Sequence, residues 1–202
     1  MSLLLNNLRI QVPADLIVRS GTVATLFDFL SNNQGLTEEY LYSHQPTTAE
    51  KLPIYSTSHT PIGYIDNAEA VKERFTILDG PLLLVARKGY AGRLSVLKDA
   101  RLIIHEDAYA IRPKDEFNAQ IDLDWFAGHY SAEFQASRTG MAGIGDFPRE
   151  RLKRITVIIP RLSFQKQCAK LYVRRADICN RYANLRDRIA DKLNTAIQIA
   201  CT

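Results

Sequence analysis

Residues 138–171 read RTGMAGIGDFPRERLKRITVIIPRLSFQKQCAKL, and this stretch decides how the rest of the chain is interpreted. A glycine-rich loop opens it, and a short apolar run at residues 155–159 follows and stops at Pro160. β-branched residues of this kind favour a strand, which proline ends. After the proline, apolar residues recur at helical spacing to the end of the chain. The stretch therefore separates a head, residues 1–160, from a helical tail, residues 161–202.

The apolar residues of the tail form a heptad-like seam, interrupted by one charge at Arg175. A helix of about 38 residues at ~1.5 Å per residue is about 57 Å long, which exceeds the diameter of a domain of this size. We therefore expect the seam to pack on a partner helix, from another chain or from the rest of a longer protein. The residues expected at this helix interface are Cys168, Leu171, Ile178, Tyr182, Leu185, Ile189 and Leu193.

The head has the pattern of a β-rich domain, in which short apolar or β-branched runs alternate with Gly, Pro, Asn and Asp. The runs predicted as strands are residues 8–12, 52–56, 63–65, 75–78, 82–86, 94–97 and 102–111, the last with an interruption at residues 106–107. Residues 22–30 fit either a helix or a strand. Helices are predicted at residues 38–43, capped by Thr37, and at residues 122–137. The expected fold class is α+β: a compact β-rich domain with a few short helices, followed by a long C-terminal coiled-coil-type helix.

One segment of the head, residues 87–93 (RKGYAGR), combines two glycines with three cations. It lies between two runs predicted as strands, so it predicts a tight hairpin. The tip of this hairpin would expose its cations and Tyr90.

Composition excludes several classes of protein. No run approaches the ~18 apolar residues that a membrane helix needs, so we expect a cytoplasmic protein. The three cysteines, Cys168, Cys179 and Cys201, form no CxxC pair and have no histidine at zinc-ligand spacing. We expect them to be reduced, and we expect no metal site.

The net charge of +4 is distributed unevenly. Between residues 148 and 175, nine Lys and Arg residues accompany a single acid, Glu150, so the local net charge is +8 and the rest of the chain sums to −4. Such asymmetry indicates either a phosphate-facing surface or a helix face whose charges serve solubility. Charge alone leaves both interpretations open.

No catalytic motif is recognisable. The loop at residues 140–145 has the glycines of a phosphate cradle, but it follows a predicted helix and leads toward a strand, which is the wrong placement for a cofactor loop. A metal-dependent nuclease would need Glu-x-Lys after a first acid, and this tripeptide occurs nowhere. We therefore expect no catalytic residues and no enzyme activity in this chain alone.

Three motifs follow one another along the chain. The first combines Gly35-Leu36-Thr37-Glu38-Glu39-Tyr40 with Leu52-Pro53-Ile54-Tyr55-Ser56-Thr57-Ser58 and Gly63-Tyr64-Ile65. The second combines Leu84-Val85-Ala86-Arg87-Lys88-Gly89-Tyr90-Ala91-Gly92-Arg93 with Asp107-Ala108-Tyr109-Ala110-Ile111. The third is the run from Ile155 to Gln165.

In this order and spacing, the chain resembles one half of a type I restriction-modification specificity subunit, over about residues 35–193. The family patterns are G-x-T-x-E-Y with P-V-Y-S-S and G-x-I, then I-x-R-x-G-x-x-G, then I-x-I-P-L-P-x-x-x-Q. Arg161 and Leu162 depart from the third pattern, where the family has an apolar-proline run.

The resemblance implies a non-catalytic reader of double-stranded DNA, with one target-recognition domain and one conserved helix. It also implies partners: methyltransferase (M) subunits, indirectly a restriction (R) subunit, and a second half-subunit joined through the helix. No cofactor is expected in this chain, because S-adenosylmethionine, ATP and magnesium would belong to the partner subunits. A natural half-subunit that dimerises and a piece of a longer chain both fit.

DNA contacts are expected from three segments. Arginine can bridge guanine bidentately, a contact worth ~1–3 kcal/mol of discrimination, or can only neutralise a phosphate. The candidate residues are Tyr55, Ser56, Thr57, Ser58 and His59, then Arg87, Lys88, Tyr90 and Arg93 at the hairpin, and Arg138 and Thr139 on the glycine-rich loop. The alternative function is an adaptor that docks an acidic protein through its basic helix and reads no DNA sequence.

Overall fold

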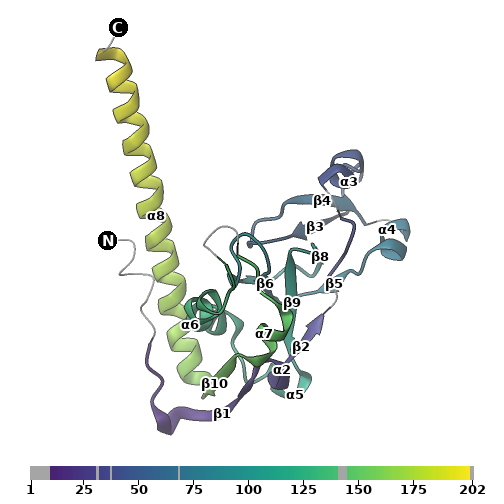
Figure 1. Ribbon diagram of the computed structural model, residues 1–202, viewed down its shortest axis with the longest axis vertical. Helices are drawn as coiled ribbons and strands as arrows, with labels where there is room; N and C mark the ends of the chain where they lie inside the picture. Colours follow the sequence, from purple (N-terminus) through teal and green to yellow (C-terminus); the bar gives the residue numbers. More distant parts are fainter. Residues whose placement is uncertain (1–9, 31, 37, 68, 141–144, 201–202) are drawn as a thin grey trace.

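Helix α8 (Leu162–Ala200) projects from a β-rich head (Figure 1). The structure, a computed structural model, describes residues 10–200 except Ser31, Thr37, Ala68 and residues 141–144, and it leaves out the side chains beyond Ile189. The predicted α+β class, with a long C-terminal helix after a β-rich domain, is confirmed.

The central sheet of the head holds, in spatial order, β2 (Phe27–Leu30), β9 (Ala108–Pro113), β6 (Leu82–Ala86) and β7 (Leu94–Leu97). All its neighbouring strands are antiparallel, and β6 and β7 form the hairpin that the sequence predicts. Every residue of β6 is buried, because this strand has protein on both faces. Leu83 and Val85 pack in the cluster of helix α6 (Leu123–Ala136), whereas Leu82 and Leu84 pack toward the second sheet. The period of two along a strand produces this division.

The second sheet has the order β4 (Gly63–Asp66), β3 (Lys51–Tyr55), β8 (Arg101–Ile104) and β5 (Leu78–Asp79). The strands expected at residues 52–56 and 63–65 and the helix expected at 38–43, now α3 (Glu38–Ser43), are therefore confirmed, although its expected cap, Thr37, lies outside the described residues. The strand expected at 75–78 is wrong except at Leu78, because helix α4 (Glu69–Arg74) extends to the residue before Phe75.

The prediction of a single strand at residues 102–111 is wrong. The segment forms two strands, β8 and β9, which belong to different sheets. Residues 105–107 turn the chain between them, and the amide of Ala108 closes this turn by donating to the carbonyl of His105 at 3.1 Å. This turn lies where the two sheets meet.

The third sheet pairs β1 (Ile17–Thr22) with β10 (Thr156–Pro160), the strand predicted before the proline. The strand expected at residues 8–12 is wrong for residues 10–12, which are irregular, and its first two residues lie outside the description. Residues 22–30, left open between helix and strand, form both: α2 (Val23–Leu26) and then β2. Short elements complete the head: η1 (Ala14–Leu16), α5 (Asp115–Asn118) and α7 (Arg149–Arg154).

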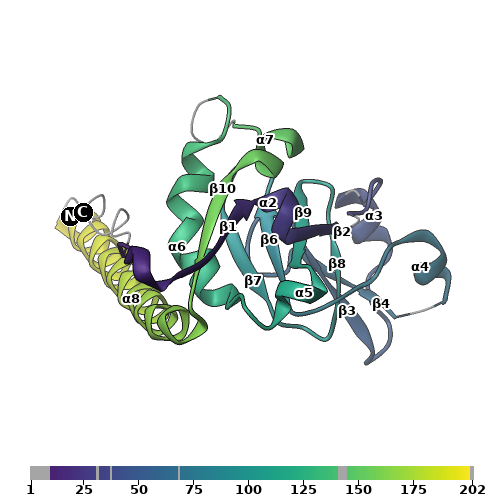
Figure 2. The same ribbon diagram turned by 90° about the horizontal axis from the view of Figure 1, so that it is seen from below.

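Helix α6 joins the head to α8, and Figure 2 shows it between α8 and the central sheet. The helix predicted at residues 122–137 is confirmed, and the carboxylate of Asp122 caps it by accepting from the amide of Trp125. The first turns of α8 bury Cys168, Ala169 and Tyr172 in the cluster around Trp125. The assignment of Cys168 to an interface with a partner is therefore wrong, because the head already covers this side chain.

Beyond these turns, the seam of α8 is open. Leu171, Ile178, Tyr182, Leu185 and Ile189 are 41–59% exposed, and the side chain of Leu193 lies outside the described part. Across the described helices, including α8, no segment is both long and apolar enough to cross a membrane.

Candidate functional site

The turn between β8 and β9, residues 105–107, brings two of the expected contact segments together. The amide of His105 donates to the carbonyl of Tyr55 at 2.8 Å, which fixes the start of the segment after β3. The amide of Arg87 donates to the carbonyl of Asp107 at 2.7 Å, which fixes the start of the hairpin tip. Both segments therefore leave the sheets at the same edge.

The glycine-rich loop returns to this edge and adds the third segment. The amide of Phe147 donates to the carbonyl of Arg87 at 2.9 Å, and the guanidinium Nε of Arg87 lies 3.5 Å from a carboxylate oxygen of Asp146. The structure thus gathers the hairpin tip, the segment after Tyr55 and the base of the glycine-rich loop into one surface.

The cations of the hairpin tip differ in their partners: two pair with carboxylates and one lies over an aromatic ring. Arg87 pairs with Asp146, and Lys88 lies 3.1 Å from the carboxylate of Asp107, so both charges are partly neutralised. Arg93 instead lies over the ring of Tyr90, 5.4 Å from its centroid, and it takes part in none of the ion pairs between described residues. The Tyr90 side chain is 67% exposed. Half-buried Arg93 and exposed Tyr90 therefore form a pair at the tip whose cation has no carboxylate partner among the described residues.

The segment after β3 is only partly available to a ligand. Tyr55 is buried in the core between the sheets, and its hydroxyl donates to the carboxylate of Asp99 at 2.7 Å. Burial, followed by this hydrogen bond, raises the pKa of the Tyr55 phenol. The expectation that Tyr55 contacts DNA directly is therefore wrong: its side chain anchors β3. Ser56 is also buried, Thr57 and Ser58 are half-buried, and His59 is exposed.

In the glycine-rich loop, Thr139 serves the loop itself. Its amide and its hydroxyl both donate to the carbonyl of Asp146, at 2.9 Å each. The Arg138 carbonyl accepts from the guanidinium of Arg151 at 3.3 Å, and the Arg138 side chain is half-buried. These contacts hold the base of the loop closed, while residues 141–144 lie outside the described residues.

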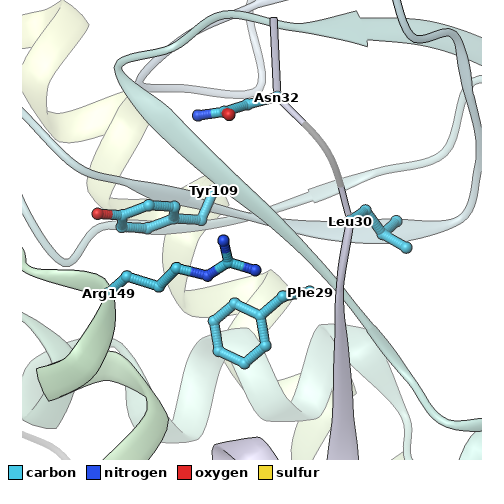
Figure 3. A pocket seen from close by; sticks show the side chains of 5 residues that line it. All are labelled: Phe29, Leu30, Asn32, Tyr109 and Arg149. Carbon is cyan, nitrogen blue, oxygen red and sulfur yellow. The ribbon is translucent and has the colours of Figure 1, made fainter.

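A pocket of about 200 Å³, which no sequence pattern predicted, opens beside this surface (Figure 3). The guanidinium carbon of Arg149 lies 5.0 Å from the centroid of the Phe29 ring. The amide group of Asn32 donates to the carbonyls of residues 106 and 108, which ties the pocket to the β8–β9 turn. Burial raises the pKa of the Tyr109 phenol, on which the charges of Arg87, Asp146 and Arg149 also act. The lining residues are Phe29, Leu30, Asn32, Tyr109 and Arg149.

These lining residues come from β2 and the segment after it, from β9 and from the start of α7, which are far apart in the sequence. Arg149 was visible only as one cation of the basic run. Among the described residues, no three His, Cys, Asp or Glu side chains come together in a way that could hold a metal ion.

No protein-family model and no curated protein matches the sequence. Solved structures share the fold, three of them as follows. A chain in a structure on the complex assembly and conformational transition of the type I restriction-modification system gives a TM-score of 0.58 at 14% identity, over 95% of this chain and 47% of that chain. The S subunit of the type I system from M. genitalium gives 0.56 at 15% identity, over 80% and 40%. The HsdS subunit from Thermoanaerobacter tengcongensis gives 0.55 at 13% identity, over 87% and 43%.

The likeness covers most of this chain, which nevertheless spans less than half the length of each of these chains. At this level of identity it shows the fold: a head and a long helix arranged as in type I S subunits. It agrees with the resemblance drawn from the three sequence motifs.

Proposed function

We propose that this chain recognises a specific sequence in double-stranded DNA as one half of a type I restriction-modification specificity subunit. The observation that carries the proposal is that, in a fold shared with S subunits, backbone hydrogen bonds bring together the hairpin tip, the start of the segment after Tyr55 and the base of the glycine-rich loop. In this role the chain is not an enzyme and acts in the cytoplasm. It directs methyltransferase subunits, and through them a restriction subunit, to the target. S-adenosylmethionine, ATP and magnesium belong to those partners.

The chemistry of the surface suits duplex DNA. Arg93, which has no carboxylate partner among the described residues, and the exposed Tyr90 can enter a groove, where a guanidinium donates to O6 and N7 of guanine. Lys88 and Arg87, already paired with carboxylates, are better suited to holding the phosphate backbone than to reading bases. His59 offers one more exposed side chain that can donate or accept a hydrogen bond.

The first prediction concerns Arg93. Replacing it with alanine should weaken binding of the full chain to its preferred duplex by about 1–3 kcal/mol and reduce the preference for that duplex over others. Fluorescence anisotropy at several salt concentrations measures both quantities. Arg188→Ala, on an exposed residue of α8 away from the head, removes the same charge and should have little effect. Equal affinities of wild type and Arg93→Ala would show that the hairpin assignment is wrong.

The exposed seam of α8 needs a second helix, because the described part of the chain leaves Leu171, Ile178, Tyr182, Leu185 and Ile189 exposed. We propose that the helix comes from a second half-subunit, either a second copy or the remainder of a longer chain. Two antiparallel helices of this kind would hold two recognition domains at a fixed distance and present a surface to the methyltransferase subunits.

The second prediction tests the seam. The case in which a second copy supplies the helix predicts a dimer of the full chain, and Leu185→Asp should then lower its molar mass in solution to that of a monomer, because the substitution buries a charge in an apolar interface. Asn184→Asp is the matched control: it adds the same charge at the neighbouring exposed position, off the seam, and should leave the mass unchanged. Light scattering coupled to size exclusion gives the mass. A dimer that survives Leu185→Asp would contradict the assignment.

An adaptor without DNA sequence readout also fits the exposed seam and the basic run. Selection of duplexes from a randomised pool with the full chain distinguishes the two functions. An enriched sequence whose binding weakens with salt supports DNA recognition. The absence of any sequence preference at every salt concentration, also with the methyltransferase subunits added, favours the adaptor.

A further inference from the structure

We propose that the pocket lined by Phe29, Leu30, Asn32, Tyr109 and Arg149 binds one phosphate group of the DNA backbone, with Arg149 as the cation that holds it. This inference rests on the proposed DNA recognition and adds to it a contact that is distinct from the hairpin tip.

Arg149 differs from its cationic neighbours because no carboxylate partners it among the ion pairs of the described residues. Arg87 and Lys88 pair with carboxylates, and Arg151 donates to the carbonyls of Ser137 and Arg138. Like Arg93 on the hairpin tip, Arg149 therefore carries a positive charge that contacts an aromatic ring and has no carboxylate partner among the ion pairs of the described residues. An anion bound in the pocket would neutralise the charge of Arg149.

An aromatic ring positions the side chain of Arg149 in the pocket. Its guanidinium carbon lies 5.0 Å from the centroid of the Phe29 ring, a cation–π contact that leaves the edge N–H groups free. Figure 3 shows the guanidinium reaching from α7 into the pocket, with the Phe29 ring on one side and the Tyr109 ring on the other. An arginine held in this way loses little side-chain entropy on binding and presents the planar fork that matches a phosphate.

The other polar groups of the pocket are consistent with an anion whose donors come from Arg149 and the Tyr109 hydroxyl. The amide hydrogens of Asn32 are already used on the carbonyls of residues 106 and 108. A volume of about 200 Å³ accommodates a phosphate group that remains part of a DNA strand.

The pocket lies next to the hairpin tip, which favours a phosphate of the same duplex over an unrelated anion. Tyr109 is the residue of β9 directly opposite Val85 of β6, two residues before Arg87. Neighbouring strands are ~4.8 Å apart, so a duplex that receives Arg93 in a groove brings its backbone over this edge of the head.

The test is the salt dependence of duplex binding by the full chain. Arg149→Gln should weaken binding roughly tenfold at low salt, equally for preferred and unrelated duplexes, and should reduce the slope of log K against log salt by about 1. Arg149→Lys should restore most of the slope, because it restores the charge. Arg154→Gln is the control, since it removes the same charge at the exposed other end of α7 and should change neither quantity.

Each outcome separates this inference from the proposed function. If Arg149→Gln binds like wild type while Arg93→Ala binds weakly, the pocket is not a phosphate site and DNA recognition stands. If Arg154→Gln weakens duplex binding as much as Arg149→Gln does, the loss reflects the lower net charge of the protein and the pocket assignment is wrong. If the wild-type chain binds no duplex at all, both proposals are overturned. Circular dichroism of each variant shows whether it is folded.

Discussion

Gln165→Leu should lower the free energy of unfolding by about 3 kcal/mol and loosen the junction between the head and α8, because Gln165 is a fully buried polar residue with three hydrogen bonds. Its Nε2 donates to the carbonyls of Gln120 and Pro160, both at 2.7 Å. Its Oε1 accepts from the amide of Asp122 at 2.8 Å. One side chain thus links the start of α8 to the start of α6 and to the end of β10. A leucine leaves all three backbone groups without this partner.

Gln165→Glu should make the stability of the junction depend on pH. The new carboxylate would face two carbonyl oxygens in a buried site, so its pKa in the folded state should be raised above that in the unfolded state. A group with a raised folded pKa lowers stability as pH increases through that range, so this variant should be most stable at acid pH and lose stability toward neutral pH.

The experiment is urea unfolding followed by the fluorescence of Trp125, which is the single tryptophan of the chain and is buried beside the junction. Gln167→Leu is the matched control, since Gln167 is exposed on the same helix, and it should change stability by less than about 0.5 kcal/mol. If Gln165→Leu and Gln167→Leu unfold at the same urea concentration, then Gln165 does not fix α8 to the head.

The same glutamine illustrates what the sequence can predict. The order of strand, proline and helix could be predicted because each has a local pattern. β-branched residues favour a strand, the proline ring ends it, and apolar residues that recur with a period near 3.6 indicate a helix. The hairpin of β6 and β7 and the helix α6 were readable for the same reason. That Gln165 would be buried was not readable, since its three partners lie on other elements and nothing in the local pattern marks a polar residue as a core residue.

Errors arose where one local pattern fits two tertiary arrangements. Residues 102–111 are apolar on both sides of a turn, so a single strand was expected where two strands enter different sheets. The heptad seam treats Cys168 and Leu171 alike, yet α6 covers the first and leaves the second exposed. Tyr55 is the last residue of a strand and precedes a polar segment, so the sequence suggested that it contacts DNA. Its hydroxyl instead donates to Asp99, a partner that is distant in sequence.

The candidate site was missed in part for a related reason. Its hairpin cations could be named from the sequence, because glycines and cations between two strands are a local signal. The pairing of Arg149 with Phe29 depends on how α7 packs against α2, the helix directly before β2, and no pattern within α7 distinguishes Arg149 from the other cations of the basic run.

Gly92→Ala should be among the most damaging single substitutions in the hairpin. It should lower the free energy of unfolding by more than about 3 kcal/mol and should also weaken duplex binding. Gly92 has φ +81°, a backbone region in which a side chain costs roughly 1–2 kcal/mol. A Cβ at this position would also lie 2.4 Å from the carbonyl oxygen of Phe134 and 2.8 Å from the amide nitrogen of Gln135. Both atoms belong to the backbone of α6, so the hairpin tip or the helix must move.

Gly89→Ala separates the two causes within the same hairpin. Gly89 has φ +66°, but a Cβ there would meet no atom within 4 Å. The free energy of unfolding of this variant should therefore fall only by the cost of the positive φ, about 1 kcal/mol. The excess loss in Gly92→Ala then measures the contact between the tip and α6. Because Arg93 follows Gly92 directly and its amide donates to the carbonyl of Tyr90, displacement of the tip should weaken DNA binding in Gly92→Ala well beyond Gly89→Ala. Urea unfolding and anisotropy on both variants decide the matter: equal losses would mean that the close approach of the tip to α6 does not position the DNA-contacting pair.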